Sequence, residues 1–195
     1  MFPASRQSPA PRSVRRKRRR VANLPRRGYT VSIELKNEVF MKILVFSDSH
    51  GNVDHMSLVV ERERPDRIFH LGDGWQDAER LRDMFPDIPL DQVPGNCDFR
   101  FTEPAVKLVK LGGKRILLCH GHTYRVKEGL MDVGYAAREQ KADLLCFGHT
   151  HIPTQEWAGE SLLLNPGSIG YWGKPTYAVV KIEDGRLTAD LRKLV

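Results

Sequence analysis

The chain has 195 residues, of which 41% are hydrophobic and 28% are charged, values that are ordinary for a soluble globular protein with one substantial core. No apolar run approaches the roughly 20 residues that a membrane-spanning helix needs, which excludes that class. The formal net charge of +7 arises in residues 1–40, which hold 11 Lys and Arg against 2 Asp and Glu; residues 41–195 hold 20 against 22 and give no nucleic-acid signal.

Residues 1–40 are predicted to be a basic N-terminal extension. Residues 1–28 include the run Arg15–Arg20, several prolines and few large apolar side chains, so we expect them to be disordered in the absence of a partner. No apolar stretch typical of a signal peptide follows the arginines. Three interpretations stay open: a tail for nucleic acid or another acidic surface, a linker without function, or an over-long gene start with Met41 as the natural first residue. Tyr29–Leu35 alternates apolar and polar residues, a weak pattern for an edge strand.

The domain pattern begins with the apolar run Ile43–Phe46, which predicts a strand buried on both faces. The further elements that we predict, in chain order, are a helix over Asn52–Arg64, a strand over Arg67–Leu71, a helix from about Gln76 to Met84, a short strand near Leu90–Val93, strands over Ala105–Leu111 and Arg115–His120, a helix over roughly Lys127–Gln140, and strands over Asp143–Phe147, Thr154–Trp157, Ser161–Leu164, Tyr177–Ile182 and Leu187–Leu191.

This order predicts the fold class of residues 41–195. A βαβαβ beginning, mixed strands with one more helix and a β-rich end favour two mixed sheets packed face to face with helices outside. We therefore expect one α/β domain, a four-layer α/β/β/α sandwich, after the extension of residues 1–40.

Polar, metal-competent residues follow five of the predicted strands. They are Asp48 and His50, Asp73, Asn96, His120 and His122, and His149 and His151. Each group is accompanied by glycine, which lets the backbone approach a ligand closely. Because α/β proteins place their chemistry at the carboxyl ends of strands, we expect these side chains to meet.

The ligand types restrict the metal. Carboxylate, amide and imidazole groups without thiolate favour Mn, Fe, Ni, Co or catalytic Zn over structural zinc. The three cysteines, Cys97, Cys119 and Cys146, are odd in number and lack CxxC spacing, so we expect no disulfide framework and a reducing, cytoplasmic location.

The ordered blocks resemble the calcineurin-like metallophosphoesterase superfamily. They are Asp48-x-His50, Gly72-Asp73, Gly95-Asn96-Cys97-Asp98, His120-Gly121-His122 and Gly148-His149-Thr150-His151. The small size, the Gly-Asn-Cys-Asp block and the segment Asn165–Ser168 are most similar to the compact YfcE-like phosphodiesterases. Asn165–Ser168 is expected to form a turn, with support of the metal site or a phosphate contact as the alternative.

The resemblance implies specific roles for these residues. Asp48, His50 and His151 would hold one metal, Asn96, His120 and His149 a second, and Asp73 would bridge them. Asp48, Asp73, Asn96 and His120 are then the expected catalytic residues, with a water activated by both metals as the nucleophile. The implied cofactors are two divalent ions, with Mn expected and Ni, Fe, Co or Zn as alternatives.

One position departs from the wider superfamily, in which many members carry a histidine where this chain has Cys97. A thiol, with a reference pKa near 8.5, is a poorer proton donor than imidazolium. Asp98 would also lose its usual partner. Cys97, Asp98 and His122 are expected to contact substrate or support the metal ligands, and good leaving groups should be favoured.

The preferred function is a divalent-metal-dependent phosphoesterase, most specifically a phosphodiesterase, acting on a small phosphoester. Two alternatives stay open. The first is a protein-binding scaffold without catalysis, for which the retromer subunit of this fold is the precedent. The second is a nuclease directed by the basic extension, the one route by which we expect nucleic-acid binding. No membrane partner is expected, and a homo-oligomer is left open.

Overall fold

The computed structural model describes residues 40–99, 101, 103–170 and 174–195, so the predicted strand Tyr29–Leu35 lies outside the described residues. The elements are β1 (Phe40–Phe46), α1 (Val53–Glu63), β2 (Arg67–His70), α2 (Trp75–Met84), β3 (Leu90–Gln92), β4 (Val106–Leu111), β5 (Lys114–Cys119), the 3-10 helix η1 (His122–Tyr124), α3 (Met131–Glu139), β6 (Leu144–Cys146), β7 (Thr154–Ala158), β8 (Ser161–Asn165), β9 (Thr176–Glu183) and β10 (Arg186–Lys193).

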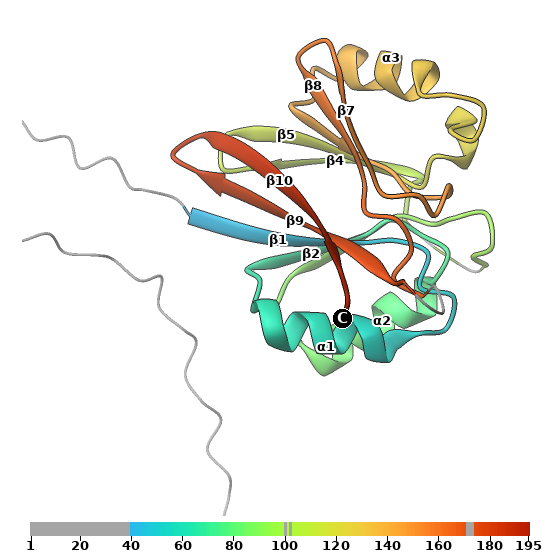
Figure 1. Cartoon of the computed structure of the whole chain (residues 1–195), viewed down its shortest axis with the longest axis vertical. Helices are drawn as coiled ribbons and strands as arrows, with labels where there is room; N and C mark the ends of the chain where they lie inside the picture. The colour runs from blue at the N-terminus through green and yellow to red at the C-terminus, as the bar shows by residue number, and fades with distance from the viewer. Residues whose placement is uncertain (1–39, 100, 102, 171–173) are drawn as a thin grey trace, which may run out of the picture. The chain divides into compact units, whose positions relative to one another are not determined.

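The first sheet has the order β10-β9-β1-β2-β3 (Figure 1). Strand β1 runs parallel to β2, and β2 runs parallel to β3, whereas β9 is antiparallel to both β1 and β10. The register places Val45 opposite Phe69 on one side and opposite Ala178 on the other. Strand β1 is therefore central and paired along both edges.

The second sheet has the order β4-β5-β6-β8-β7. Strands β5, β6 and β8 run parallel, and here one antiparallel strand, β4 or β7, closes each edge. Each sheet thus contributes three parallel strands, and the loops after those strands carry the predicted site residues.

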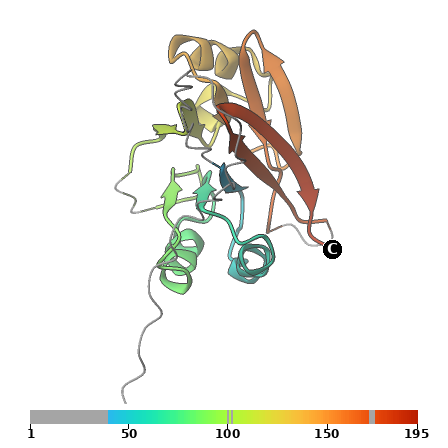
Figure 2. The same ribbon diagram turned by 90° about the vertical axis from the view of Figure 1, so that its left-hand side faces the viewer.

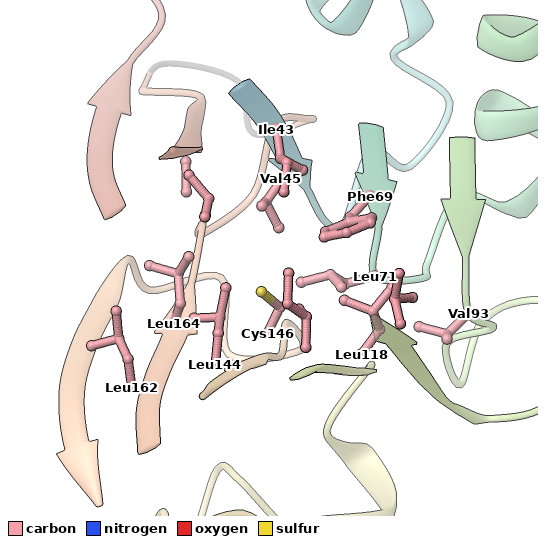
Figure 3. Close-up of a cluster of buried hydrophobic side chains, with 14 of the residues drawn as sticks. Ile43, Val45, Phe69, Leu71, Val93, Leu118, Leu144, Cys146, Leu162 and Leu164 are labelled. Atoms are coloured by element: carbon pink, nitrogen blue, oxygen red, sulfur yellow. The ribbon is translucent and has the colours of Figure 1, made fainter. Parts of the chain in front are cut away.

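A hydrophobic core lies between the two sheets. Alternate residues of β1, Ile43 and Val45, and Phe69 of β2 face Leu118, Leu144 and other apolar side chains of the second sheet (Figure 3). All of these side chains are fully buried. The inter-sheet contact forms the two inner layers of the predicted sandwich.

Two further apolar clusters attach the helices. Leu44 and Phe46, the other face of β1, pack on Met56 and Val59 of α1, with Leu81 of α2 in the same cluster. The outer face of the second sheet packs on α3 in an equivalent way. Helices α1 and α2 cover one outer face and α3 the opposite one (Figures 1 and 2). The expected four-layer α/β/β/α architecture is confirmed.

Helix α1 illustrates how local sequence sets the element bounds. The side chain of Asn52 caps the helix by accepting the backbone N–H of His55. At the other end Arg64 adopts a left-handed conformation and returns its N–H to Val60 O, immediately before Pro65. The predicted helix Asn52–Arg64 therefore agrees with α1 to within one residue at each end.

The predicted helix over Lys127–Gln140 was too long at its start. Helix α3 begins at Met131, because the chain first turns through η1 and through Gly129, whose φ is 158°. Val126 is buried against Gly121 rather than entering a helix. Strand β1 also begins earlier than the predicted apolar run, with Phe40 paired to Glu183. None of the helices in the described part of the chain has the length and apolar character of a membrane span.

Candidate metal centre

The predicted site residues converge from both sheets because each group follows a parallel strand. Asp48 and His50 follow β1, Asp73 follows β2 and Asn96 follows β3 in the first sheet. His120 follows β5 and His149 and His151 follow β6 in the second. The carboxyl ends of parallel strands are where α/β folds gather functional groups. Two groups of potential ligand atoms form there, and within each group the atoms lie within 4.8 Å of one another.

The first group consists of Asp48, His50 and His151. Nε2 of His151 lies 3.2 Å from Oδ1 of Asp48, and Nε2 of His50 lies 4.0 Å from the same oxygen. The two imidazole Nε2 atoms are 3.4 Å apart. Both histidine side chains are about 40% exposed, whereas Asp48 is fully buried. A carboxylate at the base and two imidazoles at the rim form a site that opens to solvent.

The two oxygens of Asp48 have different surroundings. Oδ2 accepts the Ser47 hydroxyl and the backbone N–H of His149. Oδ1 is buried and has no hydrogen-bond donor. A buried carboxylate oxygen left without a partner is costly, and a divalent cation bound there would satisfy it. The residues of this group therefore fit a metal ion.

The second group consists of Asp73, His120 and His149. Nε2 of His120 lies 3.5 Å from Oδ2 of Asp73 and 3.1 Å from Oδ1 of Asn96. On the other side of the ring, Nδ1 of His120 lies 2.7 Å from the carbonyl oxygen of Leu71. This hydrogen bond assigns the proton to Nδ1 and leaves Nε2 free, the arrangement found for metal-binding histidines.

The two groups adjoin. Oδ1 of Asp48 in the first lies 4.0 Å from Nε2 of His120 in the second. The ring centroids of His120 and His149 are 5.0 Å apart. The arrangement thus offers two neighbouring cation positions lined by carboxylate, amide and imidazole groups.

Electrostatics in the centre lower the pKa values of Asp48, Asp73 and His149, whereas the neighbouring carboxylates raise those of His120, against its burial, and of His151. Burial raises the pKa of Asp48, but the neighbouring imidazoles of His151 and His120 outweigh burial and lower that pKa overall. The pKa of Asp73 is likewise lowered, because the neighbouring His120 imidazole and the hydrogen bond from the Cys97 N–H outweigh burial. Burial and the proximity of His120 lower the pKa of His149 to about 4. A carboxylate binds a metal ion in its ionised form, and an imidazole binds one in its neutral form.

Several site residues have left-handed backbone conformations, which are uncommon outside glycine. Positive φ angles between 45° and 69° occur at Asp48, His50, Asp73, His149 and His151. Backbone strain of this kind persists only where the surrounding structure enforces it, and it gathers at functional sites. Five of the seven predicted ligands share it, so the loops turn sharply at the points where ligands are presented.

Two glycines permit the close approach that the sequence suggested. A Cβ at Gly95 would lie 2.1 Å from Oδ1 of Asp73, and a Cβ at Gly148 would lie 1.9 Å from the Ser47 hydroxyl oxygen and 2.8 Å from Oδ2 of Asp48. Any side chain at either position would displace a carboxylate of the centre. The glycines beside the ligand motifs are thus required by packing.

The Asp98 carboxylate is held by the backbone. In place of the histidine partner that many members of the superfamily supply, it accepts the backbone N–H groups of Asp73, Gly74, Trp75 and Gly95. Four hydrogen bonds to one ionised carboxylate hold the loop after β2 against the loop after β3. No sequence pattern signals these contacts, because backbone donors depend on the local turn.

Cys97 and His122 both lie beside the second group. Partial burial and the neighbouring Asp73 raise the pKa of the exposed Cys97 thiol, so it is a neutral group at pH 7. The His122 ring lies 5.4 Å from that of His120 and 6.1 Å from that of His149. Its Nδ1 is buried without a hydrogen-bond partner. Both residues are placed where contact with a substrate is feasible.

The segment Asn165–Ser168 supports the ligand loops. The Asn165 side-chain amide donates to Gly148 O, and the Ser168 hydroxyl donates to Asp48 O. This is the alternative that the sequence left open beside a simple turn. Sequence reasoning missed Ser47, whose hydroxyl binds Oδ2 of Asp48; its only signal was its place directly before the ligand.

Comparison with known proteins gives one consistent family. Residues 41–185 match the calcineurin-like phosphoesterase superfamily domain. YsnB, a probable metallophosphoesterase of Bacillus subtilis, is 34% identical over 154 residues, which cover 76% of this chain and 88% of YsnB. The phosphodiesterase YfcE of Escherichia coli is 30% identical over 156 residues, covering 66% of this chain and 79% of YfcE.

A solved structure agrees with these relatives. The crystal structure of a predicted phosphoesterase from Streptococcus pneumoniae superposes with a TM-score of 0.67 and 31% sequence identity, and the match covers 80% of this chain and 90% of that one. The sequence match covers both candidate ligand groups and all of the second sheet, and in the first sheet it leaves out only Phe40 of β1 and strand β10. The chain therefore belongs to the calcineurin-like phosphoesterase superfamily.

Proposed function

We propose that this protein is a divalent-metal-dependent phosphodiesterase that hydrolyses a small phosphoester with a water activated by two cations. The observation that carries the proposal is the buried, partnerless Oδ1 of Asp48, set between the imidazoles of two adjoining ligand groups. The similarity to YfcE supports phosphodiester hydrolysis as the reaction.

The proposal assigns the ligands as follows. Asp48, His50 and His151 hold the first cation, Asn96, His120 and His149 hold the second, and Asp73 bridges both. Proximity supports most of this assignment, since Asn96 Oδ1 lies 3.1 Å from Nε2 of His120. Manganese is the proposed metal, and the proposed location is the cytoplasm.

The ligand set would hold two cations, whose chemistry when bound is to lower the pKa of a water molecule and to neutralise charge on a phosphoryl group. The side chains of this protein prepare that site. Asp48 and Asp73 provide the negative charge, while the amide of Asn96 coordinates without adding more. That balance leaves an excess positive charge, which favours an anionic phosphoester.

Leaving-group chemistry distinguishes this chain within the proposed mechanism. The Cys97 thiol lies beside Asn96, and its raised pKa keeps its proton tightly bound. General acid catalysis commonly contributes about 10²–10⁴-fold, and a thiol of raised pKa supplies little of it. We therefore propose that substrates with good leaving groups, such as aryl diesters, are hydrolysed fastest.

The test is hydrolysis of a nitrophenyl phosphodiester by metal-loaded protein. Asp73→Asn should reduce the metal-dependent rate by at least about 10²-fold, because it weakens the charge shared by both cations. Asp83→Asn, a change of the same type at an exposed residue of α2, serves as the matched control and should leave the rate unchanged. Equal rates in the wild type and Asp73→Asn would refute the proposal.

The scaffold alternative makes a different prediction. A protein-binding scaffold of this fold would bind metal fully and yet show no turnover on a broad panel of phosphoesters. The complete ligand set supports the enzyme instead, because binding a partner protein does not require all seven residues. A nuclease directed by residues 1–40 would lose nucleic-acid affinity when those residues are removed, with a strong salt dependence.

A further inference from the structure

Three buried polar side chains form a hydrogen-bonded chain beneath the first ligand group. They are Ser49, in the loop after β1, His70, at the end of β2, and Asp77, in the first turn of α2. Ser49 and His70 are fully buried and Asp77 is 5% exposed. None of the three belongs to the proposed ligand set, and a buried polar network of this size calls for a specific role.

The direction of the hydrogen bonds follows from the backbone. The N–H of Gly72 donates to Nδ1 of His70, so the proton of the neutral ring lies on Nε2. Nε2 then donates to the Ser49 hydroxyl oxygen at 3.1 Å, and the hydroxyl donates to Oδ2 of Asp77 at 2.7 Å. The same carboxylate oxygen accepts the N–H of Gly51 at 2.8 Å.

This hydrogen-bonded network holds a loop with strained backbone conformations. Ser49 stands between Asp48 and His50, whose φ angles are 55° and 45°. Such conformations are strained and persist only where surrounding contacts enforce them. His70 and Asp77 hold Ser49 from below, and Asp77 also holds Gly51 on the far side of His50.

The loop after β2 packs against the network of Ser49, His70 and Asp77, which we call the clamp. A Cβ at Gly74 would lie 1.8 Å from the Ser49 hydroxyl oxygen and 3.0 Å from Oδ2 of Asp77. The loop therefore packs directly on these two side chains. The second ligand group is held differently, by Leu71 O on His120 and by the Cys97 N–H on Asp73. The side chains of Ser49, His70 and Asp77 thus hold the loop that carries the first group, and the loop after β2 contacts them through Gly72 and Gly74.

We propose that Ser49, His70 and Asp77 are positioning residues that fix Asp48 and His50 in the geometry that binds the first metal ion. This inference rests on the proposed metal centre. Residues that orient metal ligands typically change metal affinity about 10- to 100-fold when mutated. The clamp should therefore govern affinity at the first position far more than at the second.

The experiment is a calorimetric titration of the full chain, first stripped of metal, with Mn²⁺. Each variant is made in an Asn96→Ala background, which removes a ligand of the second position and lets the first titrate alone. Ser49→Ala should raise the Kd for Mn²⁺ by about 10- to 100-fold. With Asn96 intact, the affinity of the second position should change by less than about 3-fold, since its ligands are held by other groups.

The matched control is Ser161→Ala. Ser161 is also a buried serine, and its hydroxyl donates to Ala142 O at 2.7 Å, but it stands at the start of β8, away from the carboxyl ends of the strands. Urea unfolding of the metal-free variants should show similar stability losses for Ser49→Ala and Ser161→Ala. A weaker Kd in Ser49→Ala alone then separates positioning from general destabilisation.

A second variant keeps the proposal testable if Ser49→Ala fails to fold. Asp77→Asn keeps the shape of the side chain but removes its charge, and it should weaken Mn²⁺ binding in the same direction. The loss of Mn²⁺ affinity in the double variant should be smaller than the sum of the two single losses, because both substitutions interrupt the same hydrogen-bonded network. Unchanged Mn²⁺ affinity in both variants, or an equal loss in Ser161→Ala, overturns the clamp. Failure of the wild type to bind Mn²⁺ overturns the metal centre as well.

Discussion

Oδ1 of Asp48 lies 3.2 Å from Nε2 of His151, although the two residues come from different sheets. Asp48 follows the central strand of the first sheet and His151 follows the central strand of the second. The first ligand group therefore exists only when the two sheets are packed face to face. Assembly of this group therefore depends on the packing of the inter-sheet core.

This coupling predicts the consequence of a core cavity. Phe69→Ala removes a fully buried ring between the sheets and should lower the free energy of unfolding by about 3–5 kcal/mol. Leu58→Ala, at a residue of α1 that is 52% exposed, should change it by less than about 0.5 kcal/mol. Urea unfolding followed by circular dichroism measures both. Similar values for the two variants would contradict the placement of the core.

The carboxylate of Glu63 should stabilise the domain far from the metal centre. It accepts hydrogen bonds from Tyr177 Oη at 2.9 Å and from Arg192 at 2.7 Å, and Lys42 Nζ lies 3.8 Å away. Although burial alone would raise the pKa of Glu63, these partners lower it overall. Glu63→Gln should cost about 1–2 kcal/mol at pH 7, allowing for its partial exposure to solvent.

The sign of the pH dependence at Glu63 follows from the lowered pKa. Its contribution is fully present above the unfolded value of about 4.5 and is lost as the pH falls through the folded pKa. The stability difference between the wild type and Glu63→Gln should therefore shrink below pH 4.5. A difference that is constant between pH 7 and pH 3 would contradict the role of the charge, and catalysis should be unaffected in the variant.

His70 predicts a second pH effect in a different range. Burial lowers the pKa of His70 to about 4, from an ordinary value near 6.5, so the unfolded chain binds a proton that the folded one rejects. Stability should fall as the pH drops from 6.5 towards 4, by up to about 3 kcal/mol from this group. His70→Gln should flatten that part of the profile in urea unfolding of the metal-free protein. An unchanged slope in the variant would place the effect on another histidine.

Cys97 should determine which leaving groups the enzyme tolerates. In a series of aryl phosphodiesters, the rate should fall steeply as the pKa of the leaving phenol rises, because a thiol with a raised pKa donates its proton poorly. Cys97→His should restore proton donation and reduce the slope, chiefly by raising the rates of the slowest esters. Identical slopes for the wild type and Cys97→His would show that this position takes no part in protonation.

Much of this architecture could be predicted from the sequence. Uninterrupted apolar runs such as Ile43–Phe46 and Leu144–Phe147 mark buried strands, and the polar motifs directly after them mark the site. The details that escaped prediction depend on backbone geometry. The four N–H groups around Asp98 and the left-handed turns at Asp48 and His149 leave no periodic trace in the sequence. The late start of α3 was also missed, because Gly129 interrupts a pattern that otherwise favours a helix.

The most direct test of the central claim is the dependence of phosphodiester hydrolysis on added metal. Metal-free protein would be titrated with Mn²⁺, and the rate on a nitrophenyl phosphodiester would be followed against the equivalents bound. The proposed centre predicts two equivalents of tightly bound Mn²⁺ and a rate that rises as the second position fills. A rate that is the same in excess chelator, or binding of no Mn²⁺ by the wild type, would contradict it.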